Sequence, residues 1–135
     1  MKVDFTNETV FSFAGPNLCL LGTEDDFRNL SEAILELTDP HREISLELLH
    51  LNFLESVGQN QYILFSSKEN SNLLGVFNHA GQLIFELDSR YWERIFKYFT
   101  LLSWSKRTYY LNIDENCLED LDLKQDCNFI CSSEF

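Results

Sequence analysis

The pattern of apolar and polar positions predicts two amphipathic helices, each followed by a strand. Apolar residues recur at helical spacing within residues 24–37 and again within 89–102. Beyond each helix they alternate with polar residues, at 44–48 and at 109–113, as in a strand with one buried face. In the first of these strands the alternation changes phase at Leu49, so we expect a bulged strand that continues beyond it.

Two short apolar runs precede each helix, with an Ala-Gly pair between them. The runs lie at 10–13, 18–21, 76–79 and 83–87. Because glycine reaches the positive φ of a tight reversal, Gly15 and Gly81 predict two hairpins. A last apolar run in each half, at 61–67 and at 127–133, predicts a closing strand.

The two halves of the chain resemble each other. VFSFAG begins at Val10 and VFNHAG at Val76, and the predicted elements then follow in the same order. We therefore interpret residues 10–67 and 76–133 as tandem copies of one β-β-α-β-β unit. Neither copy could cover its own helix and sheet face. The prediction is thus a single α+β domain, 1–135, in which a mainly antiparallel sheet and two amphipathic helices pack as one globule.

Composition limits the class of protein. Apolar residues make up 44% of the 135 residues, which is enough for a packed core. The chain opens with no signal-peptide pattern and contains no apolar stretch near the length of a membrane span, so we expect a soluble cytoplasmic protein. The formal net charge of −12 repels nucleic acid and anionic membranes and attracts basic partners.

The residue types that carry catalysis or bind metals are scattered. Cys127 and Cys131 lack a second cysteine pair, and the three histidines form no HxxxH pattern. Five dispersed glycines form no phosphate-binding loop. We therefore expect no metal, no cofactor and no catalytic residues, with the four cysteines acting as small apolar side chains.

The charge is unevenly distributed along the chain. Residues 22–47 hold eight carboxylates against two arginines, and residues 113–126 hold six against one lysine. By contrast, five bases including Lys106 and Arg107 outnumber three acids within 86–107. The acidic segment 113–126 also falls where the two halves diverge most, and loops on a rigid scaffold often carry function.

We take the carboxylates of this segment as the first candidates for binding a partner, and those at the start of the first helix as the second. The candidates are Asp114, Glu115, Glu119, Asp120 and Asp122, followed by Glu24, Asp25 and Asp26. Two plainer interpretations stay open. The loop carboxylates could form a solvated connection, and the helix carboxylates could complement the helix dipole.

The segment LCLLGTEDDFRNLSEAILELT, residues 18–38, combines a strand, a Gly-Thr turn and a short amphipathic helix. With its flanking strands and acidic balance, the chain resembles bacterial immunity proteins that accompany polymorphic toxins of the contact-dependent inhibition type. The resemblance implies a small, cytoplasmic, non-enzymatic α+β protein that binds one toxin domain, often a basic nuclease, and blocks its active site.

Three other interpretations stay open. An adaptor or assembly subunit would bind through exposed aromatic side chains such as Tyr91, Trp104 or Tyr110. An inhibitor that mimics nucleic acid would align its carboxylates along one face. A small-molecule binding domain would use a groove between the two halves.

Overall fold

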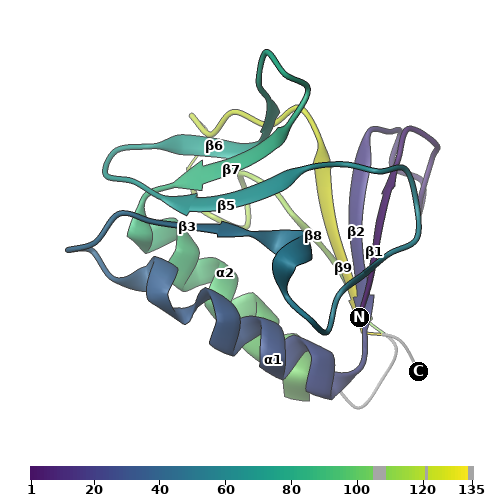
Figure 1. Ribbon diagram of the computed structural model, residues 1–135, viewed down its shortest axis with the longest axis horizontal. Helices are drawn as coiled ribbons and strands as arrows, with labels where there is room; N and C mark the ends of the chain where they lie inside the picture. Colours follow the sequence, from purple (N-terminus) through teal and green to yellow (C-terminus); the bar gives the residue numbers. More distant parts are fainter. Residues whose placement is uncertain (105–108, 121, 134–135) are drawn as a thin grey trace.

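The computed structural model describes residues 1–104, 109–120 and 122–133, in which two sheets and a pair of helices pack together (Figure 1). The predicted α+β class is confirmed. The elements in chain order are β1 (Lys2–Thr6), β2 (Asn17–Gly22), α1 (Glu24–Ile34), the 3₁₀ helix η1 (Leu35–Thr38), β3 (Ile44–Glu47), the 3₁₀ helix η2 (Leu48–His50), β4 (Glu55–Ser56), β5 (Ile63–Ser67), β6 (Asn72–Phe77), β7 (Leu83–Leu87), α2 (Ser89–Trp104), β8 (Tyr109–Ile113) and β9 (Asn128–Ser133).

Both sheets contain strands from the two halves of the chain, which meet side by side. The five-stranded sheet has the order β4-β1-β2-β9-β8, and the four-stranded sheet has the order β3-β5-β7-β6. In each sheet a parallel pair joins the halves, β2 with β9 and β5 with β7. Hairpin-like antiparallel pairs flank each parallel pair, so most strand pairs are antiparallel, as predicted.

The parallel pairs of the two sheets align equivalent positions of the two halves. Leu18 lies opposite Phe129 in the five-stranded sheet, and Leu83 lies opposite Ile63 in the other. If the halves are copies of one unit, the strands and helices that match between them span residues 2–67 and 72–133. The sequence pattern predicted 10–67 and 76–133. Tandem duplication itself stays a prediction.

The predicted strand at 10–13 is wrong. Val10 and Phe13 instead exchange backbone hydrogen bonds across a turn in which Phe11 and Ser12 have positive φ. The first strand of the chain is β1, and the connection to β2 ends in a cis peptide bond between Gly15 and Pro16. The likeness between VFSFAG and VFNHAG therefore does not reflect equivalent structure.

The predicted strand beyond Leu49 is also wrong. β3 ends at Glu47, η2 follows, and only the two residues of β4 are extended before β5 begins. Leu49, Leu51 and Phe53 pack against the core from this irregular segment, which accounts for their alternation. The hairpin predicted at Gly81 is confirmed, since this residue has φ of +77° between β6 and β7.

The helices begin where the sequence predicts. The Thr23 hydroxyl accepts a hydrogen bond from the backbone of Asp26, whose side chain in turn accepts from the Thr23 N–H. At α2 the carboxylate of Asp88 accepts a hydrogen bond from the backbone of Arg90. Phe27 and Trp92, each the fourth residue of its helix, are both fully buried.

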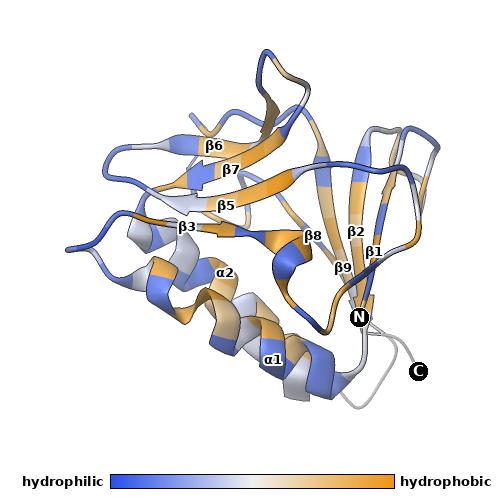
Figure 2. Ribbon diagram, in the orientation of Figure 1, coloured by the Kyte–Doolittle hydropathy of each residue, from blue (hydrophilic) through white to orange (hydrophobic). Residues whose placement is uncertain are grey.

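The core lies between the two sheets and the helix pair. Figure 1 shows the four-stranded sheet across the upper part of the view, the five-stranded sheet upright beside it, and α1 and α2 beneath both. Phe129 of β9 contacts Phe85 of β7 and Phe99 of α2, with ring centroids 4.9 Å and 6.2 Å apart. Figure 2 shows the accompanying pattern, in which both the strands and the helices combine hydrophobic stretches with hydrophilic residues. Among the described residues, no helix has the length and apolar character to cross a membrane.

Candidate functional site

The acidic loop between β8 and β9 is attached to α2 through Asp120. Its carboxylate accepts a hydrogen bond from the hydroxyl of Tyr91, and Arg90 donates to the same hydroxyl and stacks over the ring. The bond from Tyr91, together with a bond from the Asp122 N–H, lowers the pKa of Asp120. Burial, with the Asp120 bond, raises the pKa of Tyr91, which is only 4% exposed. The expectation that Tyr91 is an exposed aromatic is therefore wrong.

The other predicted loop carboxylates divide into structural and solvent-facing groups. Asp114 accepts a hydrogen bond from the backbone of Cys117 at 3.0 Å. Glu119 forms an exposed ion pair with Arg94 at 3.1 Å, a contact that contributes little to stability in water. Glu115 is half-buried and Asp122 is exposed. The loop thus holds its shape through Asp114 and Asp120, whereas Glu119 and Asp122 face solvent.

The carboxylates at the start of α1 also differ from one another. Asp26 completes the helix cap and lies 3.4 Å from the N-terminal ammonium of Met1. Asp25 pairs with Arg28 at 3.0 Å. Glu24 forms no ion pair with any residue that the structure describes, and it lines a groove between the two helices.

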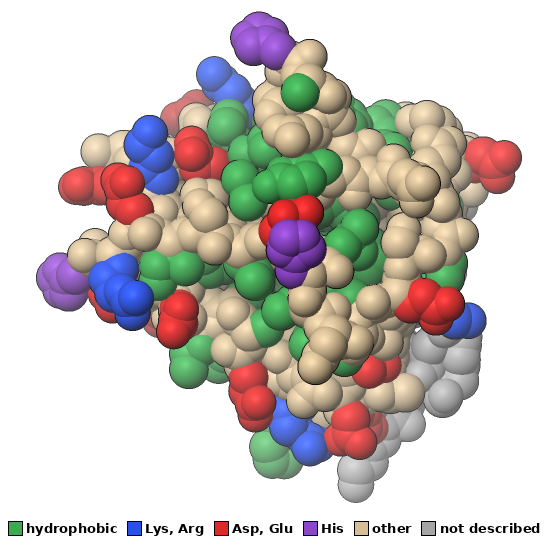
Figure 3. All heavy atoms as spheres, viewed as in Figure 1, with side chains coloured by type: hydrophobic (Ala, Val, Ile, Leu, Met, Phe, Trp, Pro, Cys, Tyr) green, Lys and Arg blue, Asp and Glu red, His purple; other side chains and the backbone are tan. Residues whose placement is uncertain are grey.

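The two groups of candidate carboxylates lie at opposite ends of α2. Asp120 contacts Tyr91 near the start of this helix, whereas Glu24 lines the groove together with Trp104 at its end. Thirteen residues of helix separate these positions, which corresponds to about 20 Å. The structure therefore does not bring the groups together in one patch. On the face drawn in Figure 3, acidic side chains spread around the rim among basic ones. Lys106 and Arg107, counted above in the basic segment, lie outside the described residues.

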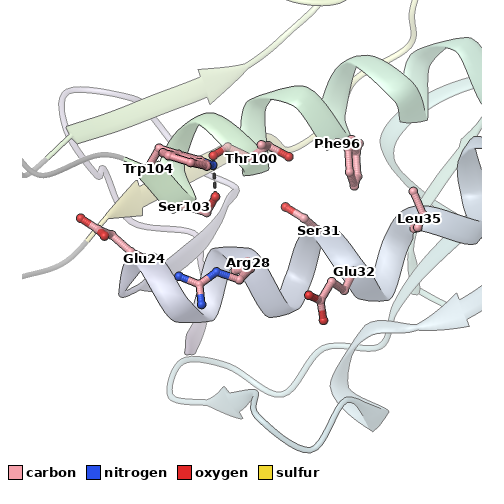
Figure 4. Close-up of a pocket in the computed structure, with 9 residues that line it drawn as sticks. All are labelled: Glu24, Arg28, Ser31, Glu32, Leu35, Phe96, Thr100, Ser103 and Trp104. Atoms are coloured by element: carbon pink, nitrogen blue, oxygen red, sulfur yellow. Dashed lines mark hydrogen bonds between the residues drawn. The ribbon is translucent and has the colours of Figure 1, made fainter.

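An apolar groove with a volume of about 480 Å³ lies between α1 and α2 (Figure 4). The helices run in opposite directions, so the start of α1 faces the end of α2. Trp104 and Glu24 lie at one end of the groove, and Leu35 and Phe96 lie at the other. Trp104 is 78% exposed. The combination of an open hollow and an exposed tryptophan is typical of a binding surface.

Small side chains form the floor of this groove. The Ser31 hydroxyl donates to the backbone oxygen of Phe27, and the Ser103 hydroxyl donates to that of Thr100. Both hydroxyl protons are therefore already used within their own helices. Recognition in the groove would depend on its apolar ends and on the charges of its rim.

A second hollow of about 510 Å³ lies near the start of α2 and is polar. Its lining includes Asp39 and Asp88, and both carboxylates accept hydrogen bonds from backbone N–H groups. Burial alone would raise the pKa of Asp88, but bonds from the Asn70 and Arg90 N–H groups outweigh it, and the pKa is lowered. These carboxylates stabilise the chain around them.

The thiols of Cys19, Cys127 and Cys131 lie near one another beside the β2–β9 pair, whereas the three imidazoles are exposed. Burial, more than any nearby charge, raises the pKa of Cys19 to about 11 and that of Cys127 to about 12, so both thiols stay protonated. His41 and His79 are exposed, and His50 pairs with Glu47 at 3.0 Å. Within the described ranges, no three His, Cys, Asp or Glu side chains are arranged to hold a metal ion.

The sequence pattern predicts a groove between the two halves only as one of several interpretations, and it does not identify the residues that line the groove. The helical pattern reaches residue 102, whereas α2 continues to Trp104. The signal for this site is Trp104 itself, which belongs to the adaptor interpretation of the sequence. No family model matches this sequence, and no curated protein sequence or solved structure matches the chain. The functional argument therefore rests on the residues themselves.

Proposed function

We propose that this protein is a non-enzymatic inhibitor that binds a basic toxin domain, of the nuclease type, and occludes its active site. The observation that carries the proposal is the acidic surplus of the chain, 22 carboxylates against ten lysines and arginines. Carboxylates of the same chain already pair with Arg28, Arg94 and Lys97. The carboxylates that remain for a partner therefore far outnumber the remaining bases. The resemblance of residues 18–38 to immunity proteins points in the same direction.

The proposed mechanism is electrostatic capture followed by burial of an apolar contact. A nuclease holds phosphates with lysine and arginine side chains, and carboxylates of the inhibitor would occupy the same cations. Charges of opposite sign speed the encounter and define its orientation. An aromatic side chain at the centre of the interface would then exclude water and slow dissociation.

Co-expression with a basic toxin domain from a reading frame next to this gene, identified by sequencing that locus, tests the proposal. The toxin domain alone should stop growth of the host cells, and the wild-type chain should restore it. Growth arrest that persists although the chain is folded and abundant would contradict the proposed function.

The contribution of the acidic loop can be tested by measuring binding kinetics between the purified chain and the same toxin domain at several salt concentrations. We expect Glu115→Gln, Glu119→Gln and Asp122→Asn together to slow association with the toxin domain and to flatten its salt dependence. Asp120 is kept because it holds the loop to α2. The control is Glu43→Gln, Glu55→Gln and Glu69→Gln, which changes the net charge equally at exposed positions elsewhere.

A second candidate function, an adaptor or assembly subunit, is favoured by the exposure of two aromatic side chains. Trp104 is 78% exposed and Tyr110 is 50% exposed. Size-exclusion chromatography with light scattering separates the two functions, because an assembly subunit associates with its own copies and a free inhibitor does not.

A further inference from the structure

The outer surface of the helix pair exposes more apolar area than the folding of the chain requires. Trp104 is 78% exposed, and Leu101 and Leu35 are each 52% exposed. Tryptophan is strongly enriched among the side chains that dominate binding energy. Trp104 of α2 and Leu35 at the start of η1 line the groove between the helices, and Leu101 lies on α2 outside its lining.

The length of the groove fits a short helix. On α1 and η1 it extends from Glu24 to Leu35, which corresponds to about 16 Å of helix. On α2 it extends from Phe96 to Trp104, about 12 Å. A helix of about three turns would lie along it, with apolar side chains at the end formed by Leu35 and Phe96 and a side chain about seven residues away at the end formed by Trp104 and Glu24.

The charges on the rim favour a cationic occupant. No ion pair joins Glu24 or Glu32 to any part of the chain that the structure describes, whereas Arg28 is already paired with Asp25. The last turn of α2 contains no basic residue that would complement the negative end of its dipole. A second copy of this chain also has a net charge of −12, so electrostatic repulsion disfavours self-association.

We infer that the groove between α1 and α2 receives a basic amphipathic helix of the partner, with one cationic side chain against the face of Trp104 near Glu24 and a second cationic side chain near Glu32 (Figure 4). A lysine or arginine beside Trp104 and Glu24 would gain a cation–π contact and an opposite charge at once. Leucine-like side chains of the same helix would fill the end formed by Leu35 and Phe96. The inference rests on the proposed function, since it names the part of a basic partner that this surface binds.

An 18-residue synthetic helix of leucine and lysine, with leucines on one face, serves as the probe. We expect the bound peptide to cover Trp104 and so to shift its fluorescence emission to shorter wavelength. Trp92 is already fully buried and should contribute little to the change. The same peptide with glutamate in place of lysine should not bind. Equal binding of the two peptides would overturn the inference.

Variants locate the binding surface. Calorimetry should show that Trp104→Ala weakens the leucine-lysine peptide about tenfold, and that Glu24→Gln with Glu32→Gln does the same. The matched controls are Tyr110→Ala, an exposed aromatic outside the groove, and Glu55→Gln with Glu69→Gln, which removes the same charge. These should stay within about twofold of wild type. If the groove variants bind as wild type does, the inference is wrong.

Protection of growth in the co-expression assay separates this inference from the proposed function. If Trp104→Ala folds and protects as well as wild type at limiting expression, the groove is not the partner site and the proposed function stands. If the wild-type chain fails to protect while the peptide still binds through Trp104 and Glu24, the proposed function falls and the preference of the groove for a basic helix stands.

Discussion

The rings of Phe5 and Phe77 meet edge to face, with centroids 6.0 Å apart and planes at 75°. Phe5 lies opposite Leu18 in the five-stranded sheet, and Phe77 lies opposite Leu83 in the four-stranded sheet. Each phenylalanine thus has the same position in its own sheet, and the two meet where the sheets approach each other. This contact joins β1 and β6, the first strands of the two halves, so side chains of both halves form the core.

Because the two tryptophans differ so sharply in burial, they make a matched pair for stability. Trp92 is fully buried and donates a hydrogen bond from Nε1 to the backbone oxygen of Ser66 at 2.8 Å. We expect Trp92→Phe to lower the free energy of unfolding by about 2 kcal/mol through the lost bond and the lost volume. Trp104→Phe should change it by less than about 0.5 kcal/mol. Urea denaturation followed by far-ultraviolet circular dichroism measures both, and similar losses for the two would contradict the described helix orientation.

Two glycines with positive φ should respond differently to alanine. Gly81 has φ of +77° in a hairpin with open space around it, so Gly81→Ala should cost about 1 kcal/mol of backbone strain. Gly75 has φ of +79° in β6, and a Cβ there would lie 3.1 Å from the ring of Phe85. We expect Gly75→Ala to cost at least twice as much, as measured by thermal and urea unfolding. A larger loss at Gly81 would contradict the close approach of Gly75 to the ring of Phe85.

The lowered pKa of Asp88 predicts a dependence of stability on pH. Its carboxylate is the favoured form in the folded protein, so its stabilisation is present above the unfolded pKa near 3.9 and is lost as pH falls through the lower folded value. Asp88→Asn should therefore flatten the fall in urea midpoint as pH is lowered below about 4. The control for the change in net charge is Glu43→Gln. The Glu43 carboxylate is exposed and forms no hydrogen bond with the described residues. An unchanged pH profile in Asp88→Asn would contradict the role of this cap.

Patterns among residues close together in the sequence predicted both helices and several strands. The cap of α1 at Thr23 and the buried positions of Phe27 and Trp92 follow from capping residues and helical spacing, and all are observed. The alternation at 44–47 and 109–113 likewise reflects β3 and β8. These features depend on residues a few positions apart, which is why a single sequence reveals them.

Features that depend on distant contacts were not predictable in the same way. The two halves are joined within each sheet by pairing such as that of Leu18 with Phe129, more than a hundred residues apart. The run at 10–13 read as a strand because it is apolar, yet Phe11 instead stacks on Tyr110, with ring centroids 4.7 Å apart. The groove required both helices in place, so its residues could not be grouped from the sequence alone.

Inhibition by stoichiometric binding is the central claim, and a titration of the purified toxin domain tests it most directly. The catalytic activity of that domain on its own substrate is measured while the purified wild-type chain is added. The account predicts that activity falls in proportion to the added chain and reaches zero at one equivalent. Activity that stays unchanged at a large excess of folded chain would contradict it.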